Sequence, residues 1–243
     1  MAAVTADAGV LAARVADVQR RVRDSGGDPD RMRIVAVTKG FGPEAVQAAQ
    51  AAGLADVGEN YAQELLAKAE SLANAELITE AEEPAAAGAS LAGIRWHFLG
   101  PVQRNKVKGL APLVGTWHGI DREAAADAVA GAAPGSEVMV QVNVTGDANR
   151  PGCHPDEVDR LVAHVRTLPL DLSGLMAVGP AEVGEGSRSC FRWLATKARE
   201  LGLRELSMGM SEDFEMAVSE GATTLRLGRV LFGDRPKRTA VRR

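Results

Sequence analysis

The sequence is short of aromatic residues, of positive charge and of long apolar runs. It holds three Trp, one Tyr and five Phe in 243 residues, which favours helices packed through small side chains over an aromatic-rich β-sandwich. The net charge of −4 provides no general basic field for a polyanion, so we expect no nucleic-acid partner. No apolar stretch reaches about 18 residues, and we therefore expect no membrane span.

Cysteine is also scarce, with Cys153 and Cys190 as the two thiols. Two thiols are too few for a disulfide framework or a cysteine-based metal site, and this usage is typical of a reducing compartment. The segment Met1–Val10 lacks a basic start followed by an apolar run, so it does not resemble a secretory signal. We expect a cytoplasmic protein.

What the sequence does contain is an alternation of short apolar runs with longer helical stretches. Its length and its 46% hydrophobic content indicate one large globular domain, residues 1–243. The eight runs are 34–37, 55–57, 96–99, 114–117, 138–142, 172–176, 206–208 and 225–227. Eight strand–helix alternations predict an α/β fold, a (β/α)₈ TIM barrel, with a doubly wound open sheet as the alternative.

Two segments depart from this rhythm. Residues Asn74–Gly93 are rich in Ala and Glu and lack a sustained apolar stripe, so we expect a mobile surface insertion between the second helix and the third strand. Residues 235–243 form a basic tail, which is either solvated or reaches a phosphate or an acidic partner.

The functional groups of such a barrel gather at the carboxyl ends of the strands. Lys39 follows the first apolar run, where partial desolvation would lower the pKa of its amine and leave a nucleophile for an aldehyde. The competing interpretation is that Lys39 reaches water or pairs with a carboxylate. His97, in the third run, is interpreted as a hydrogen-bonded core histidine.

The last two strand ends suggest an anion site. Ser211 precedes a helical stretch, so we expect it to be the N-cap, and Gly228 allows the backbone to approach a ligand closely. Barrels of this kind often bind phosphate after strands seven and eight. An aldehyde at Lys39 and a phosphate beside Ser211 together outline pyridoxal 5′-phosphate (PLP).

Seven motifs occur in order between about residue 10 and residue 235. They are Ala36–Lys39, Gly58–Tyr61, Trp96–Gly100, Gln103–Lys106, Gly174–Met176, Leu206–Ser211 and Arg226–Gly228. In this combination the sequence resembles the PLP homeostasis protein family. The resemblance implies a barrel similar to the N-terminal domain of alanine racemase, with PLP held as an aldimine on Lys39, in a monomer.

The resemblance also implies the remaining binding residues. Ser211 and the backbone at Gly228 would hold the phosphate with Ser207 nearby, Arg226 would face the pyridine nitrogen, and Asn60 and Met176 would line the ring. The resemblance implies no catalytic residue and no metal ligand. PLP-dependent apoenzymes are the partners it suggests.

An arginine at the pyridine nitrogen separates the possible activities. Arg226 would keep that nitrogen unprotonated, which weakens the ring as an electron sink and disfavours transamination and decarboxylation. A racemase needs a second base on the face opposite Lys39, and Tyr61 is the one tyrosine in the sequence. The leading hypothesis is therefore a PLP carrier that acts in vitamin B6 and amino-acid homeostasis. The alternatives are a weak PLP-dependent amino-acid racemase and an aldolase-type enzyme acting on a sugar phosphate.

Overall fold

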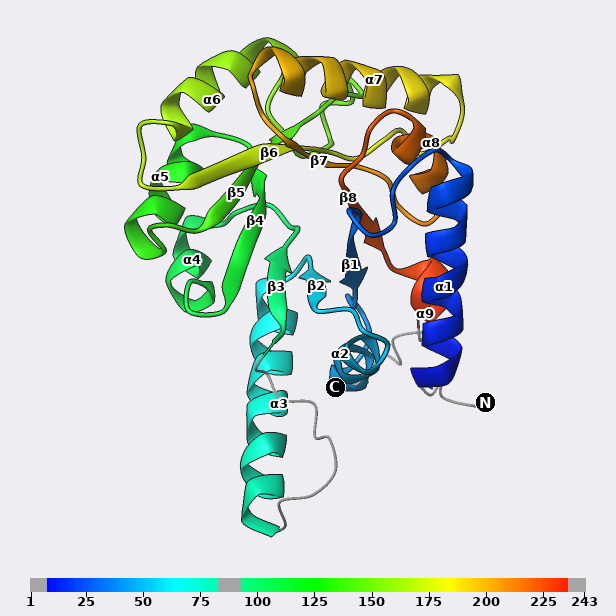
Figure 1. Cartoon of the computed structure of the whole chain (residues 1–243). Helices are drawn as coiled ribbons and strands as arrows, with labels where there is room; N and C mark the ends of the chain where they lie inside the picture. The colour runs from blue at the N-terminus through cyan, green and yellow to red at the C-terminus, as the bar shows by residue number, and fades with distance from the viewer. Residues whose placement is uncertain (1–7, 83–92, 236–243) are drawn as a thin grey trace, which may run out of the picture.

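The computed structural model describes residues 8–82 and 93–235, and eight parallel strands close into a barrel in the order β1 to β8 (Figure 1). The strands are β1 (Arg33–Val37), β2 (Asp56–Glu59), β3 (Arg95–Phe98), β4 (Val114–Ile120), β5 (Glu137–Val142), β6 (Asp171–Ala177), β7 (Glu205–Ser207) and β8 (Thr224–Leu227). Each predicted apolar run forms one strand. The (β/α)₈ barrel is thus confirmed, and the pairing of β1 with β8 excludes an open sheet.

Helices surround the barrel (Figure 1). They are α1 (Ala8–Asp24), α2 (Pro43–Ala51), α3 (Ala62–Glu82), α4 (Arg104–Leu110), α5 (Glu123–Ala132), the 3₁₀ turn η1 (Pro155–Glu157), α6 (Val158–Val165), α7 (Glu185–Glu200), α8 (Phe214–Ser219) and α9 (Arg229–Phe232). Within residues 8–82 and 93–235, no helix has the length and apolarity that crossing a membrane requires.

Alternate residues along each strand serve two different layers. Ile34 in β1 and Leu225 in β8 belong to the apolar core between sheet and helices, and full burial of one such side chain stabilises the fold by about 1.5–3 kcal/mol. Their neighbours Val35 and Arg226 point to the opposite face, the barrel interior, because successive strand residues alternate in direction. Val35 and Arg226 are also register partners, so β1 and β8 place them side by side.

Charged side chains meet at the amino-terminal end of the barrel. Arg33, at the start of β1, donates to Glu137 Oε1 at 3.0 Å, and the Thr116 hydroxyl donates to Glu137 Oε2 at 2.9 Å. This cross-barrel contact lies at the end opposite the one where ligand sites form in this fold.

Two local features differ from what the sequence predicts. The helix before β8 begins at Phe214 with Asp213 as its N-cap, so the prediction that Ser211 caps it is wrong. Residues 74–82 of the predicted insertion continue α3, whose far end extends beyond the barrel in Figure 1, because Ala and Glu are strong helix formers. Residues 83–92 of the insertion and residues 236–243 of the predicted tail 235–243 lie outside the described residues, so the mobility of the insertion and the role of the tail stay predictions. Arg235, the first residue of the tail, is described and lines the cavity at the carboxyl ends of the strands.

Candidate cofactor site

A cavity of about 870 Å³ opens at the carboxyl ends of the strands. Six of the seven residues predicted for the site line it: Lys39, Asn60, Met176, Ser211, Arg226 and Gly228. Ser207 is not among the described residues that line the cavity. Pockets of roughly 300–1,000 Å³ are typical for small ligands and cofactors.

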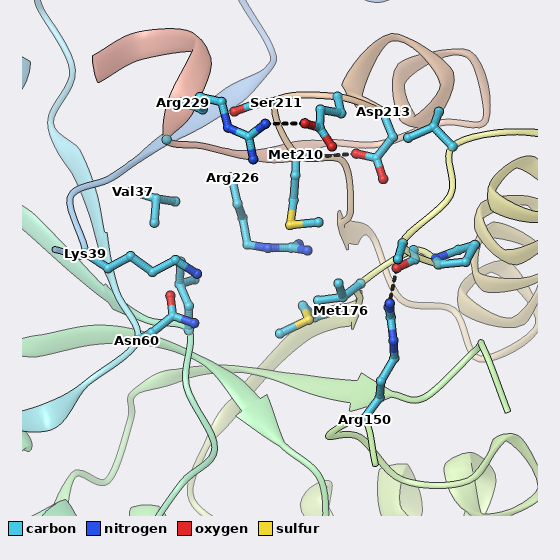
Figure 2. Close-up of a pocket in the computed structure, with 18 of the residues that line it drawn as sticks. Val37, Lys39, Asn60, Arg150, Met176, Met210, Ser211, Asp213, Arg226 and Arg229 are labelled. Atoms are coloured by element: carbon cyan, nitrogen blue, oxygen red, sulfur yellow. Dashed lines mark hydrogen bonds and ion pairs between the residues drawn. The ribbon is translucent and has the colours of Figure 1, made fainter. Parts of the chain in front are cut away.

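Lys39 comes just after β1 and points into the cavity (Figure 2). Burial lowers the pKa of its amine, and the positive charges of Arg235 and Arg226 lower it further. A larger fraction of the amine is therefore neutral, and so nucleophilic, than for an exposed lysine. The side chain is only half-buried, which leaves the amine accessible to a ligand.

A buried ion pair holds the backbone beside Lys39. The Lys68 ammonium on α3 donates to the carbonyl oxygen of Thr38 at 2.7 Å and also to a carboxylate oxygen of Glu59. The Thr38 hydroxyl donates to the same Glu59 oxygen at 2.6 Å. Because Lys68 is 5% exposed and Glu59 is fully buried, this cluster fixes the peptide that leads into Lys39. No pattern in the sequence pointed to Lys68.

Asn60 follows β2 and lies beside Lys39 in Figure 2. Its backbone packs against the end of β3, where a Cβ on Gly100 would stand 2.0 Å from the Asn60 carbonyl oxygen. Any larger residue at position 100 would therefore displace Asn60. The side-chain Oδ1 of Asn60 is buried and has no hydrogen-bond partner among the described residues, so it is left for a ligand.

Arg226 forms the floor of the cavity and is 5% exposed. Its Nη1 donates to Ser207 Oγ at 2.7 Å and its Nη2 to the carbonyl oxygen of Ala177 at 2.8 Å. Burial lowers the pKa of the guanidinium to about 10, against the charge of Asp213, so it remains a cation at neutral pH. Ser207 therefore supports Arg226 from beneath the cavity.

The upper rim of the cavity contains Ser211 and Gly228. Ser211 Oγ accepts a hydrogen bond from the Val230 N–H at 3.1 Å, so its own proton remains available to donate to a ligand. A Cβ on Gly228 would lie 3.3 Å from the Val37 carbonyl oxygen, so this position is tight for anything but glycine. Asp213, the actual N-cap of α8, instead accepts from the Met210 N–H at 2.6 Å.

Two arginines of the cavity were not predicted. Arg150, in the loop after β5, donates to the carbonyl oxygen of Gly179, and Arg229 donates to Glu212 (Figure 2). With Lys39, Arg226 and Arg235 they bring five basic side chains to the cavity, against the three carboxylates of Glu212, Asp213 and Asp234, and this excess of positive charge suits an anionic ligand. The sequence offered one signal for Arg150, which is a basic residue in the glycine-containing loop after the fifth apolar run.

The remaining strand-end prediction concerned His97. It is fully buried and bonds to Asp56 and to His118, as expected for a core histidine. His118 had no motif that pointed to it.

Comparison with known proteins agrees with this geometry. The family model described as alanine racemase, N-terminal domain, matches residues 7–236. The structure of PipY of Synechococcus elongatus, with PLP bound, aligns with a TM-score of 0.76 at 28% identity, over 92% of this chain and 100% of that one. Fold and site thus define a barrel of the alanine racemase N-terminal domain class.

Relatives of higher sequence identity show which family within this class the chain belongs to. The pyridoxal phosphate homeostasis protein of Pseudomonas aeruginosa is 38% identical over 237 residues, 93% of this chain and 96% of that protein. The protein of the same name in Aquifex aeolicus is 34% identical over 230 residues, 90% of this chain and 93% of that protein. The chain belongs to the pyridoxal phosphate homeostasis protein family, and the resemblance read from its motifs is confirmed.

Proposed function

We propose that this protein binds PLP in the cavity, with Lys39 as the covalent anchor, and acts as a carrier in intracellular vitamin B6 and amino-acid homeostasis. The observation that carries the proposal is a half-buried amine of lowered pKa in one cavity with Ser211 and Gly228. The PLP bound by the similar protein PipY supports the same assignment.

The residues present fit this cofactor. The Lys39 amine matches the aldehyde, and the Ser211 proton with the backbone at Gly228 matches the phosphate. Asn60 Oδ1 gives a buried acceptor without a partner in the described part of the chain, and Met176 contributes apolar wall. PLP would supply an electrophilic aldehyde and a ring that withdraws electrons.

Arg226 sets how strongly the ring can withdraw electrons. It is a buried cation held by Ser207 and Ala177, and facing the ring nitrogen it would donate a hydrogen bond without giving up a proton. An unprotonated nitrogen makes a weak electron sink, so the site favours holding PLP over transamination or decarboxylation.

The weak racemase is the second candidate function. Its second base would have to reach the face of the ring opposite Lys39. Tyr61, the one tyrosine of the sequence, is 61% exposed and is not among the described residues that line the cavity, which favours the carrier. Interconversion of alanine enantiomers at an ordinary enzymatic rate, lost in Lys39→Ala, would establish the racemase and contradict the carrier.

The covalent anchor is tested by reducing the purified protein with borohydride in the presence of PLP and mapping its peptides by mass spectrometry. We expect a yellow protein with a phosphopyridoxyl group on Lys39. Lys39→Ala should carry none there, whereas Lys108→Ala, which changes an exposed lysine of α4, should be labelled like the wild type. A protein that PLP cannot turn yellow, or one trapped by borohydride only with a sugar phosphate present, would contradict the proposal.

The compartment, the partners and the oligomeric state of the protein are part of the same proposal. We place the protein in the cytoplasm, where its two free thiols Cys153 and Cys190 would stay reduced. PLP-dependent apoenzymes are the proposed recipients of the cofactor, and the protein is proposed to be a monomer. Light scattering measures the mass, and a value near 25.5 kDa is the expected result.

A further inference from the structure

A line of hydrogen bonds crosses the barrel interior from Asp56, the first residue of β2, to Arg226 on the cavity floor. His97 Nε2 lies 2.8 Å from Asp56 Oδ1, and His97 Nδ1 lies 2.8 Å from His118 Nε2. His118 Nδ1 lies 2.9 Å from Ser207 Oγ, which accepts from Arg226 at 2.7 Å. His97, His118 and Ser207 are fully buried, so water does not compete along this polar line.

Irregular strand pairing places both rings. The register between β3 and β4 shifts between Trp96 and His97, and the register between β4 and β5 shifts between Trp117 and Ile120, the interval that contains His118. Such bulges redirect side chains and occur next to functional sites more often than elsewhere. The line therefore depends on two neighbouring departures from regular pairing.

The donors and acceptors at the two ends fix the direction of the line. A guanidinium has no acceptor, so Arg226 donates to Ser207. At the other end, burial opposes ionisation of Asp56, but the hydrogen bond from His97 and the nearby arginines Arg95 and Arg33 lower its pKa. Its carboxylate can therefore only accept, and His97 donates from Nε2.

The middle of the line follows from counting protons. A neutral imidazole has one N–H, so His97 Nδ1 accepts from His118 Nε2, and His118 Nδ1 accepts from the Ser207 hydroxyl. Burial lowers the pKa of His118 well below its ordinary value, the positive charges of Arg226 and Arg33 lower it further, and the ring stays neutral. All four hydrogen bonds then point from Arg226 toward Asp56, and aligned bonds strengthen one another.

If the two central hydrogen bonds, between His118 and His97 and between Ser207 and His118, pointed the other way, His97 would have to carry a proton on both ring nitrogens. The Asp56 carboxylate would pair with the resulting positive charge, but it already faces Arg95 at 3.6 Å, and the ring is fully buried in a barrel that contains the Arg226 cation, so the added charge is costly. Nor does the line deliver protons to the cavity, because the guanidinium at its end does not release one. The line of hydrogen bonds can instead orient the Ser207 hydroxyl so that a lone pair of its oxygen faces Arg226.

We propose that Asp56, His97, His118 and Ser207 are positioning residues that orient the Arg226 guanidinium toward the cofactor ring nitrogen, with Asp56 imposing the direction. This role rests on the proposed function, because it takes that nitrogen as the partner of Arg226. Asp56 opens β2 at the end of the barrel opposite the cavity, so it acts on the ligand without touching it.

Nuclear magnetic resonance of the imidazole nitrogens tests the direction in the cofactor-free protein. The sequence has four histidines, which keeps the spectrum simple. At pH 8 we expect His97 and His118 each to carry a single proton, on Nε2. A proton on Nδ1 of either ring overturns the proposed direction.

Asp56→Asn tests what imposes the direction. An amide can donate as well as accept, so we expect a second population with protons on Nδ1 of both rings. Asp171→Asn is the matched control, since it makes the same charge change at the first residue of β6, and it should keep the wild-type tautomers. Unchanged tautomers in Asp56→Asn overturn the role given to Asp56.

The link to the ligand is measured with PLP labelled with ¹⁵N at the ring nitrogen. Ser207→Ala should move that resonance toward the value of a nitrogen without a hydrogen bond and weaken PLP binding about fivefold, the effect of losing one hydrogen bond. Ser207→Thr, which keeps the hydroxyl, should restore both, and Asp56→Asn should shift the resonance in the same direction as Ser207→Ala.

The outcomes separate the two proposals. An unchanged resonance and unchanged affinity in Ser207→Ala and Asp56→Asn, with Lys39 labelled normally, overturn the positioning role alone. A wild-type protein that takes up no PLP overturns the proposed function and the positioning role together, and the tautomers measured without cofactor then describe a purely structural line.

Discussion

The buried pair of Lys68 and Glu59 offers a stringent test of how the site is built. Lys68→Met would leave the Glu59 carboxylate fully buried without its cation and the Thr38 carbonyl without its donor. Removing one partner of such a pair costs about 3–5 kcal/mol. A single domain has about 5–15 kcal/mol in total, so the variant should fold but be markedly less stable.

The pH dependence of this variant has a definite sign. Burial raises the pKa of Glu59, and Lys68 and Thr38 oppose that rise. Without Lys68 the folded-state pKa should rise further above the unfolded value, so the folded protein binds the extra proton. Stability is then lost as the pH rises from the unfolded pKa through the folded one, and lowering the pH through that window should recover part of it.

The assay is urea unfolding followed by circular dichroism without PLP, at several pH values. Lys197→Met, which breaks an exposed pair with Asp159 on the outer surface, is the control and should change stability much less. The double variant Lys68→Met/Glu59→Gln should be more stable than Lys68→Met, because it removes the unpaired charge. A loss in Lys68→Met no larger than that in Lys197→Met would refute the reasoning.

Three further predictions concern the cavity itself. Arg226→Glu should protonate the pyridine nitrogen and shift the visible spectrum of bound PLP, and an unchanged spectrum would mean that Arg226 does not face the ring. Ser211→Ala should weaken PLP retention, measured by dialysis, by about 1 kcal/mol, and equal retention would move the phosphate site elsewhere. Gly100→Ala should lower both the melting temperature and PLP affinity, because its Cβ would stand 2.0 Å from the Asn60 carbonyl oxygen; a variant with wild-type values would show that this approach relaxes freely.

The barrel was predictable because its strands are buried on both faces. Parallel strands of this kind are continuous apolar runs, so local sequence suffices to mark them. Helix ends were less certain. Ser211 and Asp213 are both good N-cap residues two positions apart, so the local sequence does not decide between them. In the structure the Ser211 hydroxyl instead accepts from the Val230 N–H of α9, and α8 begins after Asp213.

The polar interior was not predictable in the same way. The contact between His118 and Ser207 joins residues 89 positions apart, and it depends on two register shifts that leave no local pattern. Lys68 looks like any lysine on a helix, and its burial follows from the packing of α3 against β2, which brings its ammonium to Thr38 and Glu59. Lys39, by contrast, was found because a charged residue directly after a buried strand is conspicuous in the sequence alone.

The contacts of Glu137 with Arg33 and Thr116, at the amino-terminal end of the barrel, bear on how a ligand reaches the cavity. Because these side chains occupy that end and the polar line lies between it and the cavity, we expect a ligand to enter and leave by the mouth beside Lys39 and Ser211. Binding and release of the ligand therefore use the same opening of the cavity. A recipient that accelerates release has to approach that face, and anything resting on it delays both arrival and departure.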